Sequence, residues 1–528
     1  MAQPKTKNES SEPVVDPSAL EQARRDKLKR WREEYDLQPY GQRVDGLESL
    51  TVARARFDEE AESLWTSRQE ESGPDDSPED PRQRARVAGR CIQHRAMGKL
   101  VFLVLRDDTG DLQVSLSKQS LDAGEFKLAS KLDYGDIVVA EGPVGKTKRG
   151  EICIWADSFQ LHSKSLAPPP EKYHGLTDIE TRYRQRYVDM YMNPEVMQVF
   201  RLRSEILHQI RNFMNDRGFL EVETPMMQSL PGGAAARPFS THHNALDIDL
   251  FMRIAPELYL KRLLVGGMPR VYEINRNFRN EGIDRQHNPE FTMMEMYQAF
   301  SDIDGMFELQ ESLFKVLAQC ATNGQGHVIK WDDLEIDYGK PFDRVRYGDL
   351  FKQGTGLDMT DRDGVRAAAI EAGVENAGSI DHWLLVNMLF EEKGESAIDP
   401  SRPTFVTHFP SAISPLSRPD PEEPDLALRG ELFIAGMELS NSYTELNDPD
   451  VQLAKFTEQL AGEDDESSTF KSLDEDFINA LRVGMPPAGG MGLGIDRLVM
   501  LMTGCTSIRD VILFPLLKPE GGDSDENA

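Results

Sequence analysis

The stretch YEINRNFRNEGIDRQHNPEFTMMEMYQAF, residues 272–300, decides the fold of the larger part of this chain. Its two ends have the composition of strands and its middle is polar, which predicts a β-hairpin with a long loop. The loop carries these charged or ionisable side chains: Arg276, Arg279, Glu281, Arg285 and His287. Ordinary surface charge would explain such a cluster. The guanidinium fork also matches phosphate oxygens, however, so the loop suits the binding of a triphosphate.

The second strand of this hairpin holds a carboxylate in an unusual place. Strand alternation puts Phe291, Met293, Glu295 and Tyr297 on one face. An ionised carboxylate beside apolar residues is costly without a partner, and residues 288–300 contain no Lys or Arg. Either a distant cation neutralises Glu295 or its partner is a ligand, and the sequence leaves both open.

Two further segments belong with the hairpin. GFLEVETPMM (218–227) follows a segment, 193–218, whose apolar residues recur every three or four positions and therefore predict an amphipathic helix. PPAGGMGLGIDRLVMLM (486–502) has glycines at 490, 492 and 494. Glycine weakens a strand, so this alternation implies that another group approaches the backbone closely. Neither a Walker loop nor a Rossmann fingerprint occurs.

A fourth segment, ELFIAGMELSNSYTELND (431–448), spaces Glu431, Glu438 and Glu445 seven residues apart. Hard divalent cations such as Mg²⁺ are bound by one or two carboxylates plus substrate phosphates, so these glutamates are candidate ligands. Solvated acids at a sheet edge are the alternative. The pair Ala435-Gly436 interrupts the alternation, so the spacing does not say which glutamates share a face.

Ahead of these segments, residues 81–165 contain five short apolar runs separated by turn signals, which predicts a small closed barrel of the oligonucleotide-binding type. Phe102 lies in the second run among apolar neighbours, so core packing is its default interpretation. An aromatic on that face of such a barrel can instead stack on a base. Residues 18–35 predict a basic helix that is either a solvated face or a nucleic-acid contact, and residues 50–71 predict a second helix.

Composition limits the class of protein. The 528 residues carry 60 basic and 90 acidic side chains, a net charge of −30, which argues against non-specific coating of nucleic acid but does not exclude a local basic face. The four cysteines form no CxxC pair. No apolar run has the length of a membrane span and the N-terminus has no secretory signal, so we expect a cytoplasmic protein without a membrane partner.

These segments together resemble class II aminoacyl-tRNA synthetases, with 218–227, 272–300 and 486–502 in the positions of motifs 1, 2 and 3. PGGAAARPFSTHHNALD (231–247) and RIAPELYLKRLLVGG (253–267) are similar to the lysyl-tRNA synthetases specifically, and the likeness runs from about residue 84 to 517. It implies an α+β protein: a five-stranded OB-type barrel that binds the anticodon, followed by a catalytic domain with an antiparallel sheet flanked by helices. The expected domains are a helical and disordered extension with a linker (1–80), the barrel (81–165), a proline-rich linker (166–178), the catalytic domain (179–517) and an acidic tail (518–528).

The resemblance also implies an activity and site residues. The enzyme would activate L-lysine with ATP and Mg²⁺ to lysyl-adenylate, then transfer lysine to tRNA(Lys), as a homodimer. Around ATP, Arg279 would hold the α-phosphate and His287 would face the outer phosphates. Glu281 and Asn288 would lie around the nucleotide, and Phe291 and Arg497 would sandwich the adenine. Arg279 and Arg497 would be the catalytic residues. The implied metal ligands are Glu431 and Glu438. The residues that would hold lysine are Gly233, Glu257, Asn441, Glu295, Tyr297 and Glu445. On the barrel, the residues that would contact the anticodon are Arg95, Phe102, Gln113 and Glu151.

The chain departs from the pattern of many bacterial relatives at two places: Gln286-His287 stands where they have Arg-His, and Ser440-Asn441-Ser442 where they have glycines around Asn. Two alternatives stay open. A ligase that lysylates a protein side chain lacks the barrel and has Ala in place of Gly492, and an inactive tRNA-binding paralogue should have lost an arginine such as Arg279 or Arg497.

Overall fold

The computed structural model describes residues 18–41, 43–73, 78–168, 176–461 and 473–519. The predicted disordered start (1–17), most of the proline-rich linker and nearly all of the acidic tail lie outside these residues. Contacts divide the chain into two compact units, Met1–Met197 and Gln198–Ala528. Among the described residues, no helix combines the length and apolar character needed to cross a membrane.

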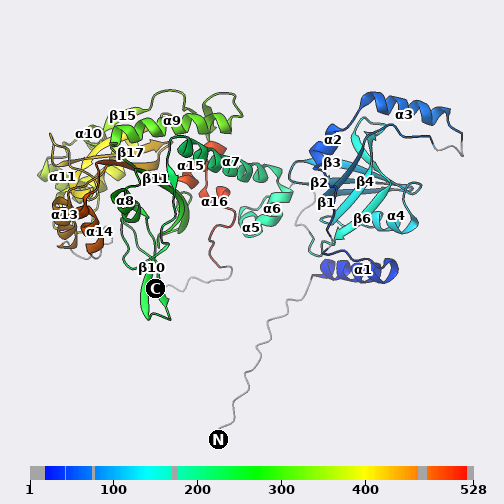
Figure 1. Ribbon diagram of the computed structural model, residues 1–528, viewed down its shortest axis with the longest axis horizontal. Helices are drawn as coiled ribbons and strands as arrows, with labels where there is room; N and C mark the ends of the chain where they lie inside the picture. Colours follow the sequence, from blue (N-terminus) through cyan, green and yellow to red (C-terminus); the bar gives the residue numbers. More distant parts are fainter. Residues whose placement is uncertain (1–17, 42, 74–77, 169–175, 462–472, 520–528) are drawn as a thin grey trace, which may run out of the picture. The chain divides into compact units, whose positions relative to one another are not determined.

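The first unit is built on a closed barrel (Figure 1), as the sequence predicts. Its strands are β1 (Arg84–Met97), β2 (Leu100–Arg106), β3 (Asp111–Ser117), β4 (Ile137–Lys146), β5 (Ile152–Ala156) and β6 (Ser158–Ser163), with α4 (Ala123–Ala129) between β3 and β4. The ring runs β1-β2-β3-β5-β4 and closes because β4 also pairs with β1. The last of the five apolar runs that predict the barrel, residues 151–162, is divided at Asp157. Its first part, β5, completes the ring, whereas its second part, β6, pairs with another part of β4.

Alternation along β2 separates the barrel core from its outer face. Val101, Leu103 and Leu105 are fully buried in the core, whereas Phe102 between them is half-buried and lies outside it. The interpretation of Phe102 as a core residue is therefore wrong.

The N-terminal helices are attached to the barrel unit. The predicted helix 18–35 is confirmed as α1 (Ala19–Tyr35), and Trp31 on it joins the barrel core. Arg24 is buried and donates hydrogen bonds to the carbonyls of Tyr134 and Ser165, so part of the basic run is structural. The predicted helix 50–71 is two helices, α2 (Leu50–Ala55) and α3 (Glu59–Glu71). Two more helices, α5 (Ile179–Arg184) and α6 (Arg186–Met192), complete the unit.

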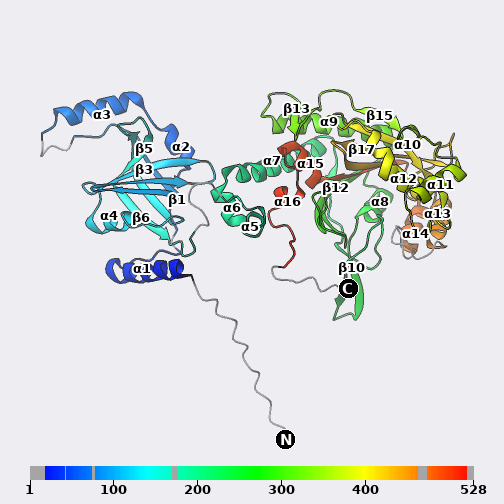
Figure 2. The ribbon, with the colours of Figure 1, turned by 180° about the vertical axis from the view of Figure 1, so that it is seen from behind.

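The second unit is organised around an eight-stranded sheet in the order β15-β16-β17-β18-β19-β12-β11-β7 (Figure 2). Its inner strands pair antiparallel, as predicted, while β15 and β7 add a parallel pairing at each edge. The bounds are β7 (Leu220–Glu221), β11 (Arg270–Phe278), β12 (Glu290–Ala299), β15 (Asp343–Arg346), β16 (Thr404–Pro410), β17 (Leu426–Ile434), β18 (Met437–Thr444) and β19 (Ala488–Gly494). Smaller pairings join β8 (Met227–Gln228), β10 (Ile248–Met252) and β9 (Ser240–His243), and β13 (Val328–Trp331) with β14 (Leu334–Asp337).

Helices cover both faces of this sheet. One face packs Met294 and Met296 of β12 against α7 (Pro194–Asp216), α9 (Ile303–Ala321) and α15 (Ile495–Thr503). The other face packs Tyr297 against α8 (Glu257–Val265), next to α13 (Pro449–Ala461) and α14 (Glu475–Gly484). The remaining helices are α10 (Tyr347–Thr355), α11 (Arg362–Glu371), α12 (His382–Leu389) and α16 (Ile508–Val511). Because alternate residues of β12 point to opposite faces, the Tyr297 face is also the face of Glu295.

Candidate active site

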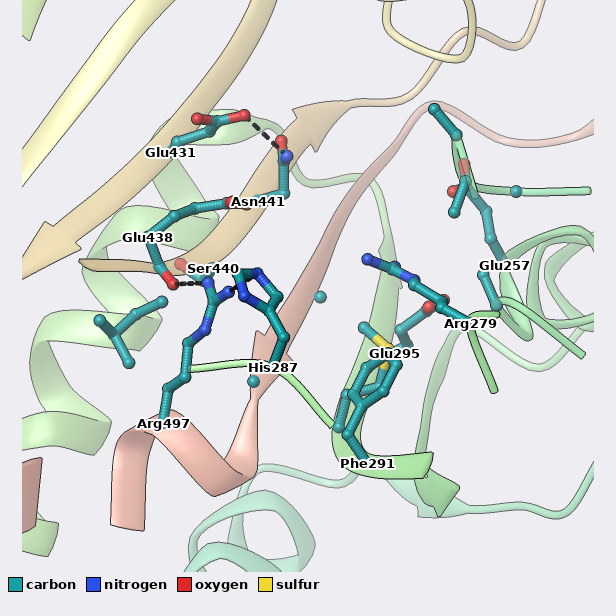
Figure 3. A pocket seen from close by; sticks show the side chains of 18 of the residues that line it. Glu257, Arg279, His287, Phe291, Glu295, Glu431, Glu438, Ser440, Asn441 and Arg497 are labelled. Atoms are coloured by element: carbon teal, nitrogen blue, oxygen red, sulfur yellow. Dashed lines mark hydrogen bonds between the residues drawn. The ribbon is translucent and has the colours of Figure 1, made fainter. Parts of the chain in front are cut away.

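A cavity of about 410 Å³ opens on the α8 face of the eight-stranded sheet (Figure 3). Its walls come from the segments that the sequence singles out: the hairpin β11–β12, the hairpin β17–β18, the glycine strand β19 and the loop around Gly233. All the site residues predicted in this unit except Glu445 line it: Gly233, Glu257, Arg279, Glu281, His287, Asn288, Phe291, Glu295, Tyr297, Glu431, Glu438, Asn441 and Arg497.

The face of β12 that the sequence predicts is the face that lines the cavity. Phe291, Met293, Glu295 and Tyr297 all border it. Glu295 is 4% exposed and forms no ion pair with any residue that the structure describes; the Tyr297 hydroxyl donates to its Oε2 at 3.2 Å. Burial, and next the charge of Glu257, raise the pKa of Glu295 well above its ordinary value. The charge of Arg279 favours the ionised form of Glu295 but does not outweigh burial, and no cation among the described residues pairs with it directly.

Beside Glu295, two other glutamates share one buried lysine. Lys261 of α8 is fully buried, and its Nζ lies 2.6 Å from Glu257 Oε1 and 2.5 Å from Glu445 Oε2. Glu445 is 1% exposed and lies outside the cavity lining. Glu445, which is predicted to help hold lysine, is thus already paired with Lys261. A direct contact of Glu445 with the substrate lysine stays a prediction.

Two glycines bring these side chains together. At Gly490 a Cβ would stand 1.9 Å from Glu445 Oε1 and 2.6 Å from the Tyr297 ring, which is the close approach that the glycine alternation predicts. Gly233 has a φ of +89°, and a Cβ there would lie 3.1 Å from the Cβ of Glu257. Both positions therefore require glycine for the glutamates to lie where they do.

At the hairpin-loop end of the cavity the cations already contact neighbouring side chains. The guanidinium of Arg279 lies 5.1 Å from the centre of the Phe291 ring. Arg497 donates from Nη1 to the carbonyl of Glu438 at 2.6 Å, and its Nη2 lies 2.9 Å from His287 Nε2. Because an arginine only donates, His287 accepts at Nε2 and carries its proton on Nδ1, 2.8 Å from Asp284 Oδ2. Figure 3 shows Arg497 with His287, and Arg279 with Phe291, as two separate groups.

The candidate metal ligands lie on β17 and β18. Glu431 is buried, with Arg429 Nη2 at 2.5 Å and Asn441 Nδ2 at 2.9 Å from its Oε1, whereas Glu438 is exposed. Burial, and next the charge of Glu438, raise the pKa of Glu431 to about 7. Two carboxylates that repel each other at a cavity wall fit a divalent cation that takes its other ligands from water and phosphates. Among the described residues, no group of three or more metal-ligating side chains forms a closed site.

The two sequence departures have different consequences. Gln286 lines the cavity, and Arg285 is exposed and does not, so the loop presents an amide rather than a guanidinium there. Ser440 and Ser442 instead hydrogen-bond the buried amide of Gln310 on α9: Ser440 Oγ donates to Oε1, and Nε2 donates to Ser442 Oγ at 2.8 Å. The second departure therefore leaves Asn441 between them in contact with Glu431.

The predicted anticodon residues lie on the barrel. Arg95 of β1 is directly opposite Phe102 of β2, and Gln113 of β3 is opposite Val104, two residues further along. Arg95 is exposed, Phe102 and Gln113 are half-buried, and Glu151 is exposed in the loop before β5. Cross-strand partners point to the same face, so Arg95, Phe102 and Gln113 share one outer surface.

Sequence reasoning missed the cations that neutralise the buried acids: Lys261, Arg429 and Arg253. A signal existed for the first two. Glu257 and Lys261 are four apart on a helix, and Arg429 and Glu431 are two apart on a strand, so each pair shares a face. Arg253 pairs with Glu273 at 2.6 Å across 20 residues, a contact that no spacing indicates.

Comparison with known proteins agrees with this geometry. The family described as tRNA synthetases class II (D, K and N) matches residues 178–518, and the OB-fold nucleic acid binding domain family matches residues 85–162. Proteins named lysine–tRNA ligase are 51% identical in Pelotomaculum thermopropionicum and 47% identical in Escherichia coli K12; each alignment covers 82% of this chain and 86% of the relative. With a cavity lined by the segments in the positions of motifs 2 and 3 and a matching family over most of its length, the chain belongs to the class II tRNA synthetases of the D, K and N group.

Proposed function

We propose that this protein is a lysine–tRNA ligase, which activates L-lysine with ATP and transfers it to tRNA(Lys). The observation that carries the proposal is a charge imbalance. Among the described residues, four buried carboxylates lie at this end of the cavity or behind it: Glu257 and Glu295 line it, and Glu273 and Glu445 lie outside the lining. Two buried cations, Lys261 and Arg253, pair with Glu257, Glu445 and Glu273, and Glu295 has no ion pair. Lysine brings two ammonium groups on a flexible chain, one for Glu257 and one for Glu295, while its single carboxylate leaves the molecule with a net positive charge.

The α-amino and ε-amino groups of lysine would occupy opposite ends of this region. Glu257 with the backbone of Gly233 suits the α-ammonium, because the Oε2 of Glu257 is turned toward Gly233 while Oε1 holds Lys261. Glu295 with the Tyr297 hydroxyl suits the ε-ammonium, and Asn441 suits the carboxylate end. Glu445 would contribute behind Tyr297.

Activation joins the lysine carboxylate to the α-phosphate of ATP and releases pyrophosphate. Arg279 would hold the α-phosphate, His287 the outer phosphates, and Phe291 with Arg497 the adenine, with Glu281 and Asn288 around the nucleotide. Such chemistry depends on positioning and on neutralising charge, so arginines suffice and no side-chain nucleophile is needed. The residues Glu431 and Glu438 fit Mg²⁺, which when bound would neutralise phosphate charge.

The partners follow from the same proposal. Phe102 with Arg95 and Gln113 offers the barrel surface for an anticodon, with Glu151 in the adjacent loop. A homodimer through the motif 1 segment is supported by apolar side chains that are exposed there: Leu220, Met226, Met227 and Leu230. Translation uses the lysyl-tRNA that this reaction would produce, so we place the protein in the cytoplasm.

The test is pyrophosphate exchange dependent on L-lysine, followed by charging of total tRNA. A lysine–tRNA ligase is active in both steps and charges one tRNA species. Exchange without charging, together with lysylation of a protein, would identify a protein-modifying ligase instead. Absence of exchange with binding of tRNA would identify an inactive paralogue, and exchange with aspartate or asparagine would contradict the lysine assignment.

A further inference from the structure

Lys261 is a buried cation that bridges the two ends of the amino-acid site. Its ammonium, on α8, lies 2.6 Å from Glu257 and 2.5 Å from Glu445 and has no solvent exposure. It also lies 6.0 Å from the centre of the Tyr297 ring. One lysine therefore contacts or approaches three of the side chains that the proposed function assigns to the substrate.

Each glutamate gives Lys261 only one of its two oxygens. The other oxygen of Glu257, Oε2, lies 3.8 Å from the point where a Cβ on Gly233 would stand. The other oxygen of Glu445, Oε1, lies against Gly490 of β19, beside the Tyr297 ring. Since a carboxylate is planar, holding one oxygen fixes the direction of the other, and Lys261 thereby orients both glutamates.

Lys261 is also the buried counter-charge of both Glu257 and Glu445. Burial opposes its ammonium, but the charges of Glu257 and Glu445 outweigh burial and raise the pKa of Lys261. The groups that face it are Glu257 on the same helix, Glu445 after β18 and the Tyr297 ring on β12. Around the two glutamates, Glu295 of β12 interacts with the charge of Glu257, and Tyr443 of β18 with the charges of Glu257 and Glu445. Burial, and next the charge of Glu257, raise the pKa of Glu445 to about 8 against the attraction of Lys261. Without the ammonium that attraction is lost, and a protonated carboxyl attracts no ammonium ion.

We propose that Lys261 is a positioning residue that sets the amino-acid specificity: it holds one oxygen of Glu257 and one of Glu445 and thereby aims both carboxylates, so that the site accepts a molecule with two ammonium groups. This inference rests on the proposed function. It differs from a structural role because it predicts an effect on lysine alone and a dependence on pH.

The experiment compares Lys261→Met, the double variant Lys261→Met/Glu445→Gln and the control Arg262→Met with wild type. Arg262 is the next residue of α8 and pairs with Asp474 at 2.7 Å, outside the cavity lining. Pyrophosphate exchange gives the KM for lysine and for ATP from about pH 6 to about pH 8.5, and thermal unfolding reports stability.

At about pH 7 the Lys261→Met variant should show a KM for lysine raised at least about tenfold, with the KM for ATP within about twofold. That rise should shrink as pH increases, because the carboxylates lose their protons. The double variant has one carboxylate fewer to repel and should regain the wild-type pH profile, and Arg262→Met should match wild type throughout.

Three results would overturn the inference. One is an unchanged KM for lysine in Lys261→Met. Another is an equal loss for lysine and ATP, independent of pH. The third is a double variant no closer to the wild-type profile than the single one. Wild-type protein without lysine-dependent exchange would overturn the proposed function itself, which separates the two failures.

Discussion

Glu273 and Glu295 lie directly opposite each other on β11 and β12, and both are buried, but only Glu273 has a cation. Arg253 Nη1 lies 2.6 Å from Glu273, and the Thr224 hydroxyl donates to the same carboxylate at 2.7 Å. Among the described residues, Glu295 has a hydrogen bond from the Tyr297 hydroxyl and no ion pair. Neighbouring carboxylates in the same sheet thus differ: Glu273 is neutralised by Arg253 within the described protein, whereas we propose that the substrate neutralises Glu295.

This difference predicts opposite results for two matched substitutions. Glu295→Gln should raise the KM for lysine roughly ten- to a hundredfold with little change for ATP, because a charge-assisted hydrogen bond contributes about 1.5–3 kcal/mol. Its thermal stability without ligand should hold or rise. Glu273→Gln should instead destabilise the fold by about 3 kcal/mol, because Arg253 stays buried without its counter-charge. Exchange kinetics and thermal unfolding of both proteins check this, and equal behaviour of the two variants would contradict it.

The raised pKa of Glu295 predicts a pH dependence of stability. Above the ordinary glutamate pKa of 4.5 the unfolded state has lost this proton, while the folded state still binds it. The unfolded state then binds fewer protons, so the free energy of unfolding falls as pH rises toward the folded pKa. Ligand-free wild type should show this slope, and Glu295→Gln should have a flatter one. Chemical denaturation at several pH values measures it; a steeper slope in the variant would be contrary to the assignment.

Adjacent residues of β2 offer a test of the barrel surface. Phe102→Ala should lose about 1–3 kcal/mol of tRNA affinity, because a base would no longer stack there, while lysine-dependent exchange stays unchanged. Leu103→Ala, one residue away in the core, should instead lose about 2–5 kcal/mol of stability. Filter binding of tRNA and thermal unfolding distinguish the two. If Phe102→Ala destabilised the fold as Leu103→Ala does, Phe102 would have a packing role only.

Metal dependence tests the carboxylates of β17 and β18. Glu438 is exposed, so Glu438→Gln should leave the fold intact yet greatly weaken adenylate formation and raise the Mg²⁺ concentration for half-maximal exchange. Exchange titrated with Mg²⁺ measures both. Activity equal to wild type at limiting Mg²⁺ would refute Glu438 as a ligand.

The glycine strand gives a fifth, steric prediction. Gly490→Ala would place a Cβ 1.9 Å from Glu445 Oε1 and 2.6 Å from the Tyr297 ring, and should therefore raise the KM for lysine at least about tenfold. Gly492→Ala meets the flexible terminal methyl of Met293 at 3.1 Å and Glu295 Cγ at an ordinary contact distance of 3.7 Å, and should therefore cost less. Kinetics with lysine and ATP check the ranking, and a larger effect at Gly492 would reverse it.

Much of the site follows from local sequence, and the remainder depends on contacts distant in the chain. Alternation is enough to place Phe291, Glu295 and Tyr297 on one wall, because a strand has a fixed period. It fails at Glu438, since the turn at Ala435-Gly436 and a register shift opposite it change the parity. The pairing of Lys261 with Glu445, 184 positions later, is set by packing of α8 against the sheet, which no spacing reveals.

The contact of Arg279 with Phe291 has a consequence for which nucleotides the cavity admits. In the ligand-free molecule the ring proposed to stack on adenine is already faced by a guanidinium, 5.1 Å away. When ATP binds as proposed, the guanidinium of Arg279 would bind the α-phosphate and leave the face of the Phe291 ring. The ring would then be free to stack on the adenine, and the charge of Arg279 would be paired. Adenosine has no phosphate to bind Arg279, so its base would have to displace the guanidinium from the ring without a compensating interaction. From the proposed roles of Arg279 and Phe291, we therefore expect free nucleosides to compete poorly with ATP for this site.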